Sequence, residues 1–495
     1  MNKENKKSIL ILSMGSYLTM GVDLIQNLIL VPIYINYFGT ELYGLWIATG
    51  GIVSTFAFLD LGIASLSIQK ISKNKSLNQL TKIGDNISTS LILITILATT
   101  IFSVGSYFSV QLLNIIPYDY DYHNILLLCF VISLLGLSAQ LIGNVIEGIL
   151  ISLKKELYSK KAQVFSAVVG VIVLTYLTFK TKSITAIPIG LASRSILNLI
   201  INLTGLIKTI YIEKIYNLTP RRETVKEYLI IIPYLFLSKF FNALSGSIES
   251  IAITKFISPE VTTFYTVSKK LASFIRSIID KIGGIIYPQI PRLDLNKLSA
   301  KKTVTKLFKF TQMIAFVFMS VYVISNEIFV NIWVSPEHYI GEKTSFLIAC
   351  TLLIGFFTNY YNYCLGAINE FKFSSTISFI EAFLKSVFIY TILSYKMIDN
   401  MLIFSITVSF IFMIINLSRW RNKIHLNEIY KSFFVSIVLF LFVFTVKSYL
   451  FKDFKIDNNW LNFIILSFIS FSIFSISYLM INKDLYSILK KNIFK

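Results

Sequence analysis

The chain has 495 residues, of which 55% are hydrophobic and only 15% are charged, and its mean hydropathy is +0.70. These values exclude an ordinary water-soluble globular protein. A formal net charge of +20 would suggest nucleic-acid binding in a soluble protein. In a membrane protein the same surplus sets the topology and meets anionic lipid headgroups, so we expect membrane lipids and no nucleic acid as partners.

Long apolar segments follow one another along almost the whole chain. A helix needs about 20 apolar residues to cross the hydrocarbon core, where it satisfies its own backbone hydrogen bonds. The segments lack the alternating pattern of barrel strands. We therefore predict an all-α polytopic membrane protein with about 14 transmembrane helices. The predicted spans are 9–36, 42–69, 87–113, 123–151, 162–179, 184–207, 228–254, 261–290, 310–333, 344–368, 374–395, 400–418, 432–450 and 459–481.

The positive charges between these spans alternate from one side to the other. Most of the 46 Lys and Arg residues fall in the two terminal tails and in every second connection. Cytoplasmic connections carry an excess of Lys and Arg, so this pattern predicts that both termini are cytoplasmic.

Motifs for several other functions are missing from the sequence. Cys129, Cys350 and Cys364 all fall within predicted spans, without the spacing of a disulfide framework or a zinc site. The chain has no P-loop, nucleophile elbow or H-E-x-x-H sequence. We expect neither a built-in ATP motor nor an enzyme, and no cofactor or metal.

Polar residues at helical spacing interrupt several spans. A charge at mid-bilayer costs roughly 2.5–3.5 kcal/mol, so such residues usually face a cavity or a partner. The polar residues are Ser16, Thr19, Asp23, Gln26 and Asn27 in the first span, Asp60 in the second, Gln140, Asn144 and Glu147 in the fourth, Gly190, Arg194, Asn198 and Asn202 in the sixth, Lys239, Asn242, Gly246 and Glu249 in the seventh, and Lys269, Lys270, Ser273, Arg276 and Asp280 in the eighth.

Some charges in the spans have an alternative, structural explanation. Arg276 and Asp280 are four residues apart and can neutralise each other, as can Glu381 and Lys385. Others have no opposite charge within one helical turn, and we predict that they face a water-filled cavity. The members of this second group are Asp23, Asp60, Glu147, Arg194, Lys239 and Glu249.

The signs of the charges favour an anionic substrate, because Lys and Arg hold phosphate and pyrophosphate by charge-assisted hydrogen bonds. The predicted substrate-binding residues are Arg194, Lys239, Lys269, Lys270 and Arg276, with Lys270 on an offset helical face. Intramembrane carboxylates would balance these cations or carry a coupling ion, H⁺ or Na⁺. The predicted acidic residues are Asp23, Asp60, Glu147, Glu249 and Asp280.

Two stretches resemble a known family. Residues 37–46 read Tyr-Phe-Gly-Thr-Glu-Leu-Tyr-Gly-Leu-Trp and are followed by Leu-Asp-Leu-Gly at 59–62. They resemble the N-terminal signature of bacterial polysaccharide flippases, the O-antigen (Wzx-type) translocases of the multidrug/oligosaccharidyl-lipid/polysaccharide (MOP) exporter superfamily. The pattern from Phe264-Tyr265 through Lys269-Lys270 to Tyr287-Pro288 resembles the start of the second half in that family.

This resemblance implies two pseudo-symmetric six-helix lobes, residues 1–210 and 211–418, that rock around a central cavity. Residues 419–495 would add two helices, as in the fourteen-helix lipid II flippases. The implied substrate is an undecaprenyl-pyrophosphate-linked oligosaccharide, of O-antigen or capsule type. It would move from the inner to the outer leaflet of the bacterial cytoplasmic membrane, through a monomer that works beside other polysaccharide assembly proteins.

Three alternatives remain open from the sequence. A lipid II flippase would share the fold, and so would a multidrug exporter, although organic cations would favour an acidic chamber. A membrane-embedded glycan polymerase or ligase is the enzyme alternative. Such enzymes usually carry a large outer loop, whereas the outer connections here are short.

Overall fold

A computed structural model describes the backbone of residues 3–57, 62–215, 217–286, 298–368, 370–450 and 460–481. Within these ranges it leaves out the side chains of 3–13, 57, 76, 231, 233–243, 281–286, 366–367, 371, 448–450 and 481. The described residues form helices and connecting turns, with no strand among them. They fall into two compact units, Met1–Thr262 and Thr263–Lys495.

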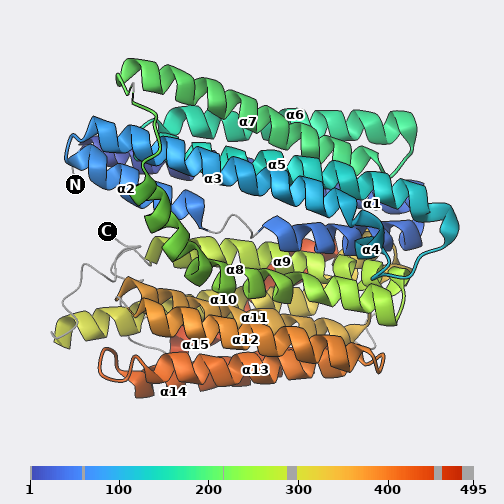
Figure 1. The fold of residues 1–495 in the computed structure, drawn as a ribbon. Coiled ribbons are helices and arrows are strands. Elements are labelled where there is room, and N and C mark those ends of the chain that lie inside the picture. The colour runs from blue at the N-terminus through green and yellow to red at the C-terminus, as the bar shows by residue number, and fades with distance from the viewer. Residues whose placement is uncertain are drawn as a thin grey trace. The chain divides into compact units, whose positions relative to one another are not determined.

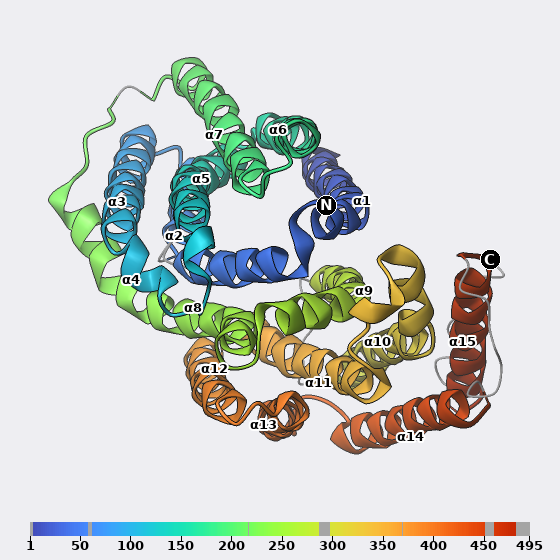
Figure 2. The same ribbon diagram turned by 90° about the vertical axis from the view of Figure 1, so that its right-hand side faces the viewer.

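The first unit contains α1 to α8. Their bounds are α1 Lys3–Ala57, α2 Ile63–Ser76, α3 Leu80–Tyr107, α4 Ser109–Leu113, α5 His123–Ser152, α6 Glu156–Thr181, α7 Ala186–Ile212 and α8 Arg222–Phe256. Helices α3, α5, α6 and α7 run alongside one another, as Figures 1 and 2 show. Helix α1 packs on α5, α6 and α8, while α2 packs on α3 and α5.

A glycine divides the long helix α1 into two parts. Gly39 has φ 80° and ψ 162°, which is not a helical conformation and which a side chain would disfavour. This kink lies between the first two predicted spans, 9–36 and 42–69. The predicted break between these two spans is confirmed. Gly39, which forms it, belongs to the stretch 37–46 that resembles the family signature.

The second unit contains the remaining long helices, α9 to α15, apart from the first turn of α9. Their bounds are α9 Pro259–Ile286, α10 Leu298–Trp333, α11 Glu342–Ala367, α12 Phe371–Leu393, α13 Ile398–Ser418, α14 Leu426–Leu450 and α15 Trp460–Ile481. Helix α13 packs on α11 and α12, and both α14 and α15 pack on α10. The last two helices therefore pack as part of the second unit.

The prediction of a polytopic all-α membrane protein is confirmed. Eleven of the described helices are long and apolar enough to cross a membrane. Large apolar side chains on them remain exposed, such as Ile96, Ile172 and Phe468, as expected for surfaces that face lipid. Each predicted span overlaps a helix. The count of 14 and the lobe boundaries at 210 and 418 stay predictions.

Candidate functional site

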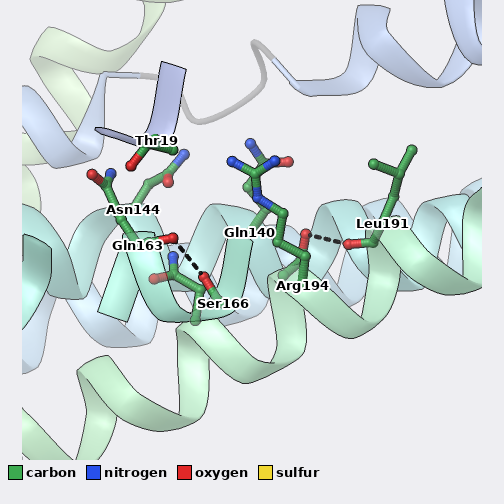
Figure 3. A pocket seen from close by; sticks show the side chains of 9 residues that line it. Thr19, Gln140, Asn144, Gln163, Ser166, Leu191 and Arg194 are labelled. Carbon is green, nitrogen blue, oxygen red and sulfur yellow. Dashed lines mark hydrogen bonds between the residues drawn. The ribbon is translucent and has the colours of Figure 1, made fainter. Parts of the chain in front are cut away.

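A polar cavity of about 350 Å³ lies within the first unit, among α1, α5, α6 and α7. Figure 3 shows side chains that line it, from α1, α5, α6 and α7. Amides and hydroxyls dominate its wall. The lining residues are Thr19, Gln140, Asn144, Gln163, Ser166, Leu191, Arg194, Ser195 and Asn198. The predicted polar stripes of the first, fourth and sixth spans thus meet in one place.

One ion pair joins α7 to α1 at the cavity. Arg194 Nη1 lies 2.5 Å from Asp23 Oδ1, and Nη2 lies 3.5 Å from Oδ2. The two side chains retain 26% and 42% of their exposed surface. Both were predicted to face a cavity, and each has the other as its partner although they are 171 positions apart in the sequence. The pair is open enough for a ligand to compete for the guanidinium group.

A second polar cluster sits beside the cavity, between α5 and α6. Lys160 Nζ donates to Glu147 Oε1 at 3.1 Å and to Gln163 Oε1 at 2.7 Å. Gln163 Nε2 donates to both carboxylate oxygens of Glu147, at 3.0 and 2.8 Å. The side chains of Glu147 and Lys160 are only 12% and 11% exposed. Lys160 therefore balances the charge of Glu147, and both carboxylate oxygens of Glu147 accept hydrogen bonds. Gln163 connects this cluster to the cavity wall.

Two glycines allow the helices to approach closely enough to place these cations. A Cβ at Gly15 would lie 2.7 Å from the Lys160 Cβ, which is too close for two carbon atoms. A Cβ at Gly170 would lie 2.6 Å from the Arg194 Cβ. The absence of a side chain at these points lets α1 and α7 pack directly on α6, as small residues do between membrane helices.

The predicted residues of the eighth span lie on α9. Arg276 Nε lies 3.0 Å from each carboxylate oxygen of Asp280, and its Nη1 donates to the carbonyl oxygen of Leu352 at 2.6 Å. Its guanidinium also lies 5.1 Å from the ring centroid of Phe356. The alternative explanation, that Arg276 and Asp280 neutralise each other, matches this geometry. Asp280 itself stays 51% exposed.

The remaining predicted residues are more dispersed. Lys269 Nζ lies 3.4 Å from the hydroxyl of Tyr265, and Lys270 Nζ lies 5.8 Å from the ring centroid of Phe274. Glu249 is buried on α8. Asp60 and the side chain of Lys239 lie outside the described residues.

Lys160 is a site residue that the sequence reasoning missed. The predicted fifth span begins at 162, which left Lys160 in a cytoplasmic connection, whereas α6 begins at Glu156. The available signal was the short connection after α5, because two helices joined by so few residues must lie side by side. Glu147 and Lys160 are 13 residues apart across that connection.

Comparison with known proteins agrees with this architecture. The family model described as "Polysaccharide biosynthesis protein" matches residues 6–294, more than half of the chain. No curated protein sequence matches this chain.

Several solved structures share the fold. Lipid II flippase MurJ, in an inward closed conformation, has a TM-score of 0.70 at 13% identity, covering 96% of this chain and 100% of that chain. An inward-facing multidrug resistance MATE family transporter of the MOP superfamily has a TM-score of 0.55 at 16% identity, covering 90% and 100%. A MOP superfamily transporter from Pyrococcus furiosus, described as having a binding pocket of reverse polarity, has a TM-score of 0.54 at 15% identity, covering 88% and 96%.

These proteins are flippases and transporters by their own descriptions, and at such low identity they show the fold alone. The match of the family model over more than half of the chain carries the assignment. This chain belongs to the polysaccharide biosynthesis protein family and has the fold of MOP-superfamily transporters.

Proposed function

We propose that the protein is a flippase for an undecaprenyl-pyrophosphate-linked oligosaccharide, which it carries from the inner to the outer leaflet by alternating access. The observation that carries this proposal is the polar cavity of the first unit with Arg194 in its wall. The family supports a role in polysaccharide biosynthesis. In this proposal both termini are cytoplasmic and the lipid tail stays in the bilayer while the headgroup crosses.

The composition of the cavity wall suits a sugar headgroup that carries phosphate. Of the lining side chains that the structure describes, Arg194 alone is charged, and most of the others offer amides or hydroxyls. Amides and hydroxyls hydrogen-bond sugar hydroxyls, and the planar guanidinium of Arg matches phosphate oxygens. The described wall offers no carboxylate to an organic cation, which argues against a multidrug exporter.

The volume of the cavity limits what it holds. Ligand pockets typically measure about 300–1,000 Å³, so a cavity of about 350 Å³ is at the small end. It has room for a pyrophosphate and the sugar next to it, and too little for a whole oligosaccharide. We infer that Arg194 and its neighbours hold the lipid-proximal part of the headgroup.

The pairing of Arg194 with Asp23 suggests how the site is emptied and filled. Asp23 balances the charge of Arg194 at 2.5 Å. An entering pyrophosphate would displace Asp23, and the released carboxylate would then be available to a proton or a sodium ion. Glu147 is a weaker candidate for ion coupling, because Lys160 and Gln163 already engage it.

A lipid II flippase is the second candidate, favoured by the similarity of fold to MurJ over 96% of this chain. Both candidates use a lipid-linked pyrophosphate, so the cavity suits either. Complementation separates them. Rescue of cells depleted of their peptidoglycan flippase would indicate lipid II, while rescue of surface glycan in cells lacking a polysaccharide flippase would support our first proposal.

The experiment for the proposed role of the cavity compares two charge deletions on the same helix. Arg194→Gln removes the cation from the cavity wall, and we expect it to abolish glycan export. Lys208→Gln removes an exposed cation further along α7 that does not line this cavity, and we expect normal export. Membrane levels of both variants are measured by immunoblot. Full export by Arg194→Gln would contradict the proposal.

A further inference from the structure

A second cavity, of about 610 Å³, lies in the first unit where α2 ends and where α3 and α8 begin. Figure 1 shows these helix ends at the same end of the unit as the N-terminus. Its lining residues are Lys70, Lys73, Asn74, Leu77, Gln79, Lys82, Asp85, Asn86, Arg221, Glu223, Thr224 and Glu227. None of these residues lines the cavity that contains Arg194.

The wall of this second cavity is held by a buried carboxylate. Asp85 on α3 is 3% exposed and accepts hydrogen bonds from the backbone N–H of Arg221 at 2.7 Å and from the Thr224 hydroxyl at 2.6 Å. Asp85 thus caps the first turn of α8 from a neighbouring helix, where a carboxylate also complements the helix dipole. The cavity is therefore a built feature between packed helices.

The charges in the wall do not cancel. Asp85 is engaged by the backbone and by Thr224, and Glu227 forms an ion pair with Lys70, which also lies 4.9 Å from the Tyr228 ring centroid. Glu223 is the third carboxylate of the wall. Four cations face these three carboxylates. Among the described residues, no carboxylate forms an ion pair with the side chain of Lys82 or of Arg221.

We propose that this cavity binds the phosphate-bearing headgroup of an anionic membrane phospholipid, with Lys82 and Arg221 as the phosphate ligands. Basic pockets at the cytoplasmic ends of membrane helices are suited to such headgroups. A headgroup held here would bridge α3 and the start of α8, and so would stabilise the packing of these two helices. This inference is independent of which substrate the protein transports.

Native mass spectrometry of the detergent-purified full chain tests the proposal. We expect phosphatidylglycerol to stay bound at concentrations at which phosphatidylcholine is lost. The double variant Lys82→Gln/Arg221→Gln is expected to bind phosphatidylglycerol roughly tenfold more weakly or worse, because each Lys or Arg contributes to headgroup attraction. The matched control is Lys208→Gln/Arg222→Gln, which removes the same charge from exposed residues outside the cavity and keeps full binding.

The source of the phosphate is tested in the same measurement. Neither inorganic phosphate nor a short-chain prenyl pyrophosphate is expected to displace the bound phosphatidylglycerol, and displacement by either would overturn the assignment to a phospholipid. Equal binding by the two double variants would overturn the site itself. Lys82→Gln alone changes only an exposed side chain, so its weaker binding in a normally folded protein supports the assignment and unchanged binding refutes the role of Lys82.

Discussion

Removing one or both members of the Asp23–Arg194 pair distinguishes a ligand-binding arginine from a structural one. In Arg194→Gln the cavity loses its cation, whereas in Asp23→Asn the cation stays and loses its internal competitor. If Arg194 holds the pyrophosphate, the two single variants shift headgroup affinity in opposite directions. The double variant then behaves like Arg194→Gln.

The expected changes in headgroup affinity follow from how far the two side chains are exposed. Asp23 is 42% exposed and Arg194 26%, so the pair resembles a surface ion pair that is worth about 0.2–1 kcal/mol. A charge-assisted hydrogen bond from Arg to phosphate is worth about 1.5–3 kcal/mol. Arg194→Gln should therefore weaken headgroup binding roughly 10- to 150-fold, while Asp23→Asn should strengthen it at most about fivefold.

The assay is the binding of a short-chain prenyl pyrophosphate to the purified protein in nanodiscs, with Lys208→Gln as the control. Thermal unfolding in the same nanodiscs checks that the variants are folded. A purely structural pair predicts a different pattern, in which both single variants bind equally poorly and the double variant recovers. That result would refute the role of Arg194 as a ligand.

Three further predictions concern the packing that supports the two cavities. Lys160→Met leaves the nearly buried Glu147 without a cation, and we expect it to lower the free energy of unfolding in denaturant by about 3–5 kcal/mol. Adding Glu147→Gln should restore part of this stability. Equal stability of the single and double variants would show that the buried charge of Glu147 does not need Lys160. Gly170→Ala places a methyl group against Arg194, so we expect it to lower the free energy of unfolding by about 1–3 kcal/mol and to lower export. In the control Gly50→Ala the added methyl group meets nothing within 4 Å, and export should be unchanged. Equal export by the two variants would count against the close approach of α6 and α7 at Gly170. Asp85→Ala should lower the free energy of unfolding by about 1.5–3 kcal/mol, because the hydrogen bonds to Arg221 and Thr224 are lost. Glu223→Ala, in the wall of the same cavity, should leave the free energy of unfolding nearly unchanged.

The sequence predicts the helices well because a helix that crosses the hydrocarbon core must be long and apolar. A span needs a long apolar run, and each predicted run overlaps a helix of the structure. The break at Gly39 is also predictable, since a glycine at a predicted turn can adopt the positive φ that the kink requires.

The candidate site is predictable only in part. Helical periodicity places Gln140 and Asn144 on one face of α5, and both line the cavity. Periodicity holds no information on which helices are neighbours, so it cannot pair Asp23 with Arg194. Lys160 and Asp85 were missed for a related reason. Both lie in helical turns that precede the apolar runs, and hydropathy alone begins the helix too late.

The proposed function requires the polar cavity around Arg194 to carry a pyrophosphate-linked glycan across the membrane. The most direct measurement is the translocation of a fluorescent undecaprenyl-pyrophosphate-linked oligosaccharide in proteoliposomes that contain the purified protein. We predict translocation by the native chain and by Lys208→Gln, and none by Arg194→Gln. Equal translocation by all three proteins, or none by the native chain under an imposed proton or sodium gradient, would contradict the proposed function.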